Sequence, residues 1–164
     1  MLGRRLHAGN NWSAGEVGHM VIWPQGRICY CGKKGCSDAY LNTGVLLREE
    51  EEGREEGLEA FFRRLGDKDP DAMAVWDTYL DNLAILCSNL RMVLDLDIIL
   101  GGEVGAWMDP WIEELSIRME SLDLFSRDVD YLSACRCKKH IFPIGAALSA
   151  MDRFDESMLA DETD

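Results

Sequence analysis

The sequence has no hydrophobic run that is long enough to cross a membrane. Its longest apolar stretch extends from Val93 to Leu100, and Asp95 and Asp97 interrupt it, whereas a membrane-spanning helix needs roughly 20 apolar residues. We expect no secretory leader, because Arg4 and Arg5 are not followed by an apolar segment with a small-residue cleavage site. We therefore expect a cytoplasmic protein with no membrane partner.

Positive charge is scarce as well. The 164 residues include 17 Lys and Arg against 30 Asp and Glu, which gives a formal net charge of -13. Such a surface repels phosphate backbones, so we expect no nucleic-acid partner for this chain alone. The six cysteines do not indicate a disulfide framework, because a chain of this size does not need disulfides for stability and three of the six lie within eight residues near a histidine, which favours a metal.

The sequence does contain the hydrophobic residues and the periodicity of one layered domain. Hydrophobic residues make up 47% of the chain, which is ample for a buried core. Residues 1–45 are rich in glycine and turn residues and indicate short strands and loops. The charged run at 48–57 has no apolar stripe and indicates a solvated helix end or a surface loop.

Helices and strands alternate in the rest of the chain. The pairs Asp69-Pro70 and Asp109-Pro110 predict helix starts, since each joins an N-cap acid to a proline at the first helical position. Strands at 97–100 and 129–132 follow these helices, and a last helix is predicted at 143–151. The order predicts an α/β fold with parallel strands and right-handed crossovers. The inward positions of the two helices are predicted to be Trp76, Leu80, Leu83, Cys87, Leu90 and Leu94, and Ile112, Leu115, Met119 and Leu122.

Three cysteines and one histidine form a candidate metal site. Cys29, Cys31 and Cys36 lie within eight residues of one another, and His19 precedes Cys29 by ten positions. Three thiolates and one imidazole nitrogen are a tetrahedral ligand set that suits zinc. Because all four positions are protein ligands, the zinc would be structural and would have no open position for water. The alternative is a group of free thiols and an unrelated surface histidine.

This segment resembles the signature of the ROK family of bacterial sugar kinases and sugar-responsive repressors. The signature joins a Glu-x-Gly-His element, here Glu16 to His19, to Cys-x-Cys-Gly-x-x-Gly-Cys, here Cys29 to Cys36. Residues 98–102 resemble the family's later glycine motif, and 144–148 resemble its C-terminal helix. The resemblance covers nearly the whole chain and implies an actin-like, ribonuclease H-like ATPase fold.

By the same resemblance, residues 1–151 form the C-terminal lobe of such a protein. The zinc loop lies at 19–36 within this lobe, and an acidic tail at 152–164 lies outside it. The family's phosphate loop and the Asp that serves as general base precede the Glu-x-Gly-His element, whereas only 15 residues precede Glu16 here. We therefore expect a fragment without a catalytic residue of its own, for which ATP matters only in a complete kinase parent.

The resemblance also implies two groups of ligand-binding residues. Glu16 and His19 match positions that contact sugar hydroxyls, and Asp38 stands where the family usually has a glutamate that binds sugar. The alternative for Asp38 is an acid in the first turn of a helix, where the helix dipole stabilises it. The glycines of the later motif lie against the nucleotide in the family's kinases, which would assign Gly101, Gly102 and Gly105 to nucleotide binding.

Two functions are open for the parent protein. One is a sugar-sensing transcriptional repressor, and the other is an ATP-dependent kinase of a hexose or an N-acetylhexosamine. Glu103 interrupts the family's glycine run, where a carboxylate near phosphates is unfavourable, and Asp38 has a shorter reach than glutamate. Both departures favour the repressor, which is our expectation; a chain produced alone would be a zinc-stabilised module without a ligand. A lone lobe exposes apolar surface, and dimer formation is predicted from Trp107, Trp111, Phe125 and Phe142.

Overall fold

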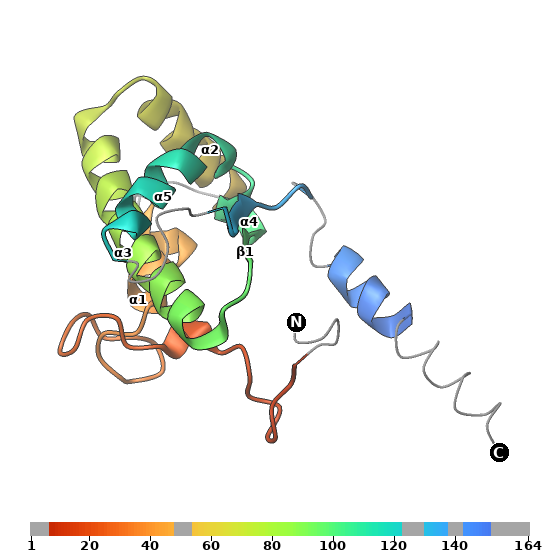
Figure 1. Cartoon of the computed structure of the whole chain (residues 1–164). Coiled ribbons are helices and arrows are strands. Elements are labelled where there is room, and N and C mark those ends of the chain that lie inside the picture. The colour runs from red at the N-terminus through yellow and green to blue at the C-terminus, as the bar shows by residue number, and fades with distance from the viewer. Residues whose placement is uncertain (1–6, 48–53, 123–129, 138–142, 152–164) are drawn as a thin grey trace, which may run out of the picture.

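The central element is α3, a helix that spans Pro70–Leu94. The computed structural model describes residues 7–47, 54–122, 130–137 and 143–151, and in it α3 contacts α1, α2 and α5 (Figure 1). The predicted start of α3 is confirmed, because the Asp69 side chain accepts a hydrogen bond of 2.9 Å from the N–H of Ala72. The helix ends where Asp95 adopts a left-handed conformation with a φ of 48°.

The inward stripe of α3 is confirmed over most of its length. Trp76, Leu80 and Cys87 are buried, and Leu83 and Leu90 are half-buried. The prediction is wrong for the last position, since the side chain of Leu94 is 46% exposed. Met92 and Val93, the other apolar residues of the final turn of α3, are exposed as well.

A second helix, α2, spans Arg54–Gly66 and was not expected from the sequence. It begins inside the charged run, and its apolar residues start only at Leu58. The four buried side chains recur at the spacing of one helix face, and they are Leu58, Phe61, Phe62 and Leu65. This face packs against α3, so α2 belongs to the core layer. The part of the charged run before α2, residues 48–53, lies outside the described residues.

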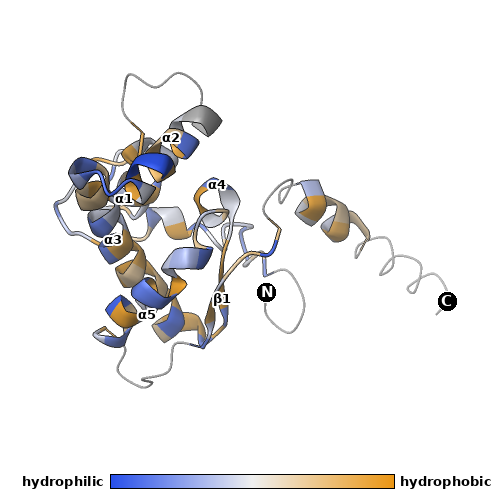
Figure 2. Ribbon diagram, turned by 90° about the horizontal axis from the view of Figure 1, so that it is seen from above, coloured by the Kyte–Doolittle hydropathy of each residue, from blue (hydrophilic) through white to orange (hydrophobic). Residues whose placement is uncertain are grey.

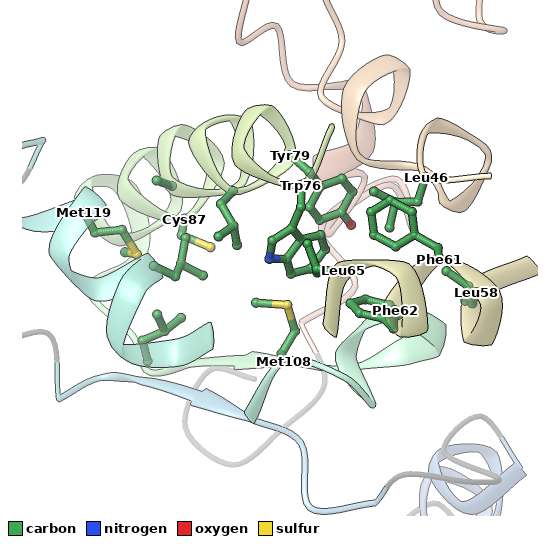
Figure 3. Close-up of a cluster of buried hydrophobic side chains, with 14 of the residues drawn as sticks. Leu46, Leu58, Phe61, Phe62, Leu65, Trp76, Tyr79, Cys87, Met108 and Met119 are labelled. Carbon is green, nitrogen blue, oxygen red and sulfur yellow. The ribbon is translucent and has the colours of Figure 1, made fainter. Parts of the chain in front are cut away.

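Aromatic rings join α2 to α3 in the main hydrophobic core. Trp76 lies in the middle of the cluster that Figure 3 shows, with side chains of α2 on one side and Met119 and Cys87 on the other. The Trp76 ring stacks on Tyr79 with 5.2 Å between centroids and meets Phe62 edge-on at 5.1 Å. Loss of such a buried ring typically costs about 3–5 kcal/mol of unfolding free energy.

Two short parallel strands border this core. β1 spans Ile98–Leu100 and β2 spans Leu132–Ala134, with Ile98 opposite Leu132. The parallel pairing is confirmed, but β2 begins three residues later than predicted because residues 130 and 131 form the turn that enters it. The connection from β1 includes α4 (Gly102–Gly105), the 3-10 turn η3 (Asp109–Trp111) and α5 (Ile112–Glu120).

The predicted face of α5 is confirmed in its centre and wrong at its end. Leu115 and Met119 are fully buried, and Ile112 is half-buried against the core. Leu122 lies beyond the helix and is 45% exposed. Arg118 holds α5 on α3 through ion pairs with Asp77 and Asp81, which is a contact that no periodicity reveals.

The N-terminal segment has turns in place of the expected short strands. It contains the 3-10 turn η1 (Val17–His19), the short helix α1 (Asp38–Leu41) and the turn η2 (Thr43–Val45). Two isolated antiparallel bridges join Val21 to Cys36 and Ile28 to Lys34. These bridges fold the segment between η1 and α1 back on itself.

The predicted last helix at 143–151 is confirmed, and it stands apart from the helical core (Figure 2). Nearly all of its described side chains are exposed. No helix in the described part of the chain combines the length and apolarity that crossing a membrane requires. The acidic tail at 152–164 lies outside the described residues.

Two of the aromatic residues that predicted dimer formation belong to the core. The Trp107 ring stacks on Phe62 with 4.7 Å between centroids, and Trp111 meets Trp76 edge-on at 5.5 Å. Phe125 and Phe142 lie outside the described residues. Self-association therefore stays a prediction, and these two tryptophans no longer support it.

Candidate functional site

The structure brings the four predicted metal ligands together. One ligand atom from each of His19, Cys29, Cys31 and Cys36 lies within 4.8 Å of all the others. The Sγ atoms of Cys31 and Cys36 are 3.7 Å apart, and Cys29 Sγ is 3.7 Å from His19 Nδ1. Ligands on a tetrahedral zinc ion with Zn–S bonds of about 2.3 Å are separated by roughly 3.8 Å. The donor set and its spacing therefore fit a four-coordinate zinc ion.

Glycine allows the loop to close around this cluster. Gly35 has a φ of +83°, and a Cβ atom at this position would lie 1.8 Å from the carbonyl oxygen of Trp23. Gly32 has the same φ and donates a backbone hydrogen bond of 2.9 Å to the oxygen of Cys29. No other residue type could occupy position 35 without moving the backbone that carries Cys36.

The protein alone provides little to stabilise three thiolates. Burial raises the pKa of the Cys36 thiol to about 11, and hydrogen bonding with Cys31 and Cys29 adds to this effect. Cys31 is exposed, and a hydrogen bond from the backbone N–H of Lys33 lowers the pKa of its thiol. A bound cation would offset the effect of burial on Cys36 and favour its thiolate.

The start of α1 is fixed against the turn that carries Glu16 and His19. The Ser37 hydroxyl donates to the oxygen of Val17 at 2.7 Å, and the Ser37 N–H donates to the oxygen of Met20 at 2.8 Å. Ser37 is 1% exposed, so both bonds are shielded from water. Asp38, the next residue, therefore lies beside the Glu-x-Gly-His turn.

Asp38 and Glu16 both lie close enough to the cysteine loop for their charges to act on Tyr30. A Cβ atom on Gly18 would lie 3.5 Å from Asp38 Cβ, which places Asp38 directly against the turn. Asp38 is the first residue of α1, as the helix-dipole interpretation also requires, and it is half-buried while Glu16 is exposed. The three predicted sugar-binding residues thus belong to one surface.

Tyr30 is a member of this site that the sequence reasoning did not identify. Its hydroxyl lies 3.1 Å from Nε2 of His19, and the two rings meet edge-on with 5.2 Å between centroids. Partial desolvation and then the negative charge of Asp38 raise the pKa of the Tyr30 phenol, and Glu16 contributes in the same direction. The only signal in the sequence is its position between Cys29 and Cys31, where an aromatic residue is ordinarily read as loop packing.

A pocket of about 460 Å³ joins this surface to the later glycine motif. Asp38, Gly101 and Glu103 are among the residues that line it. The Thr43 hydroxyl donates to Oε2 of Glu103 at 3.0 Å across this pocket. The turn depends on glycine, because Gly102 has a φ of +79° and a Cβ atom on Gly105 would lie 2.8 Å from the oxygen of Leu100.

Comparisons with known proteins agree on one family. A profile of the ROK family matches residues 1–126. The chain is 33% identical to an N-acetylmannosamine kinase of Vibrio cholerae serotype O1 over 71% of this chain and 41% of that protein. It is 34% identical to an N-acetylgalactosamine kinase of Shewanella sp. (strain ANA-3) over 60% of this chain and 35% of that protein. The chain therefore spans about two fifths of the length of the curated relatives that it matches.

A solved structure supports the fold. The ROK hexokinase from Thermus thermophilus superposes with a TM-score of 0.53 at 24% sequence identity, over 69% of this chain and 39% of that one. This similarity confirms the mixed α/β fold of that family, which the sequence resemblance implied.

Our expectation that the parent protein is a repressor is wrong. The relatives are named as kinases of N-acetylated sugars, and the structural neighbour is a hexokinase. The Glu103 carboxylate accepts a hydrogen bond of 3.0 Å from the Thr43 hydroxyl, a contact that the sequence alone does not reveal. The profile match over residues 1–126, together with the relatives, shows that the chain belongs to the ROK family.

Proposed function

We propose that this chain carries the zinc centre and the sugar-recognition surface of an ATP-dependent N-acetylhexosamine kinase. The observation that carries the proposal is the convergence of the Glu16–His19 turn, the cysteine loop and Asp38, which Ser37 fixes in place. The names of the relatives support an N-acetylated sugar as substrate. A phosphoryl transfer from ATP to a sugar hydroxyl would yield ADP and a sugar phosphate.

Zinc would act as the organiser of the sugar site. His19 Nδ1 and the sulfur atoms of Cys29, Cys31 and Cys36 would hold it, and four protein ligands leave no position for an activated water. The metal would then orient the His19 ring, so that its second nitrogen keeps a fixed direction toward the Tyr30 hydroxyl, 3.1 Å away. Glu16 and Asp38 would accept hydrogen bonds from sugar hydroxyls on the same surface.

The nucleotide would lie toward the glycine turn after β1. Gly101 lines the pocket that Asp38 also lines, and Gly102 and Gly105 give the turn its close backbone approach. Backbone N–H groups of such a turn suit phosphate oxygens. We assign no general base to this chain, because the resemblance places that Asp before the Glu-x-Gly-His element.

Two measurements test this proposal. Metal analysis of protein purified without added zinc should find about one zinc ion per chain. Ligand-observed NMR should then detect N-acetylmannosamine on the zinc-loaded chain with millimolar or weaker affinity, because one lobe supplies few contacts. Glu16→Gln should abolish the signal, and Glu59→Gln on the exposed face of α2 should keep it. Equal signals from the two variants would remove Glu16 from the site.

A further inference from the structure

The carboxylates of the proposed sugar site cannot satisfy every group of an N-acetylated sugar. Glu16 and Asp38 accept hydrogen bonds and do not donate them. They match sugar hydroxyls and the acetamido N–H, which can donate. The acetamido carbonyl only accepts, so a site that prefers an N-acetylated sugar over the plain hexose needs a donor of its own.

Tyr30 holds such a donor at the right place. His19 Nδ1 faces the cysteine cluster, 3.7 Å from Cys29 Sγ, while its Nε2 lies 3.1 Å from the Tyr30 oxygen. When Nδ1 of a neutral imidazole binds a metal, Nε2 carries the hydrogen and acts as a donor. The His19 Nε2–H would therefore donate to the Tyr30 oxygen, which leaves the phenolic proton of Tyr30 to donate to a ligand.

The surroundings of Tyr30 also differ from those of a structural tyrosine. Its side chain is 81% exposed and meets the imidazole of His19 edge-on. Tyr40 in the same segment is half-buried, and its oxygen accepts a hydrogen bond of 2.7 Å from the N–H of Arg27. Tyr40 thus holds the loop, whereas the hydroxyl of Tyr30 is directed by the metal ligand His19 and remains open to solvent.

We propose that Tyr30 is a specificity-determining residue, whose hydroxyl donates to the acetamido carbonyl of an N-acetylhexosamine while Glu16 and Asp38 accept from the ring hydroxyls. This inference rests on the proposed function, because it needs the sugar to bind at this surface. It predicts that the Tyr30 hydroxyl contributes to binding of the N-acetylated sugar and not to binding of the corresponding hexose, whose C2 hydroxyl can donate to a carboxylate.

The test compares two sugars that differ only at C2. N-acetylmannosamine and mannose are titrated into the zinc-loaded 164-residue chain, with ligand-observed NMR as the readout. Tyr30→Phe should weaken binding of the N-acetylated sugar by about threefold to tenfold, the range of one neutral hydrogen bond, and should leave the affinity for mannose unchanged. Trp12→Phe is the matched control, since it removes an N–H donor from an aromatic side chain that is 83% exposed in the same segment; it should change neither sugar.

The outcomes separate this inference from the proposed function. An equal loss for both sugars in Tyr30→Phe, or no loss for either, would overturn the role of Tyr30 while sugar binding itself stands. A loss of zinc or an altered charge-transfer spectrum of the cobalt-substituted Tyr30→Phe protein would also overturn it, because Tyr30 would then act by positioning His19. Absence of binding of both sugars to the unmodified chain would overturn the proposed function and this inference with it.

Discussion

Removal of the metal should release the cysteine loop and leave the helical core folded. The segment 19–37 contributes no side chain to the main hydrophobic cluster, and it is joined to α3 by the hydrogen bond from Trp23 Nε1 to Asn82 Oδ1. Its backbone hydrogen bonds, such as the one of 2.8 Å from the N–H of Gly35 to the oxygen of Arg27, are worth about 1 kcal/mol each. A metal at a free concentration of about 1,000 times its Kd adds about 4 kcal/mol, so the ion is the larger source of order.

Hydrogen exchange measures this difference residue by residue. After chelation, the amides of Gly32 and Gly35 should exchange about a thousandfold faster, since about 1.4 kcal/mol corresponds to a factor of ten. The amides of Leu80 and Cys87 in α3 should keep their protection. Cys29→Ser should show the fast loop exchange without any chelator. Loop protection that chelation does not change, or an equal loss in α3, would refute the reasoning.

Four further predictions concern the thiols, the loop and the oligomeric state. Gly35→Ala should lose zinc, because its Cβ would lie 1.8 Å from the Trp23 oxygen; a normal zinc content by metal analysis would contradict this. The double change Cys135→Ala and Cys137→Ala should retain one zinc ion per chain, since these thiols are outside the cluster that the described residues form. Burial raises the pKa of Cys87 to about 12. The protonated thiol therefore contributes its full share of the unfolding free energy below the pKa of the unfolded thiol, and this contribution is lost as the pH rises above that value. In urea unfolding, the unfolding free energy should therefore fall between pH 7.5 and pH 10 by about 2 kcal/mol more in the unmodified chain than in Cys87→Ala. Light scattering at micromolar concentration should show a dimer, and a clean monomer would contradict that prediction.

Features whose physics is local could be predicted from the sequence. The start of α3 depends on Asp69 and the proline after it, and these residues act on the first turn regardless of the rest of the fold. The metal cluster is similar, because all four ligands lie between positions 19 and 36 and glycine turns close the loop. In both places the relevant partners are neighbours in the chain.

The helix α2 shows how a local reading fails. The charged residues at 48–57 suggested one solvated segment, and that impression concealed the apolar face that starts at Leu58 and continues through Phe61 and Phe62. Charged residues are compatible with a helix wherever they face water. The test that would have found α2 is whether apolar residues recur at helical spacing immediately after the charges, which they do.

The sequence could not reveal the role of Tyr30 for a different reason. Its importance comes from the direction of the His19 ring, which is set by the cysteines that flank Tyr30 itself. A sequence shows that an aromatic residue lies between two metal ligands, but it does not show on which side of the loop the ring emerges. Only the folded loop shows that the Tyr30 hydroxyl lies 3.1 Å from Nε2 of His19.

The interpretation of Glu103 has the same weakness, because the sequence does not show which residue its side chain contacts. A departure from a family motif is therefore hard to interpret from the sequence alone. A carboxylate in a glycine turn argues against a phosphate ligand only if the carboxylate points at the phosphate. Thr43 lies 60 residues earlier, lines the same pocket and donates a hydrogen bond to Glu103. That bond orients the Glu103 carboxylate toward Thr43 while its negative charge remains. The charge of a substituted residue therefore says little about ligand binding until its hydrogen-bonding partner in the fold is known.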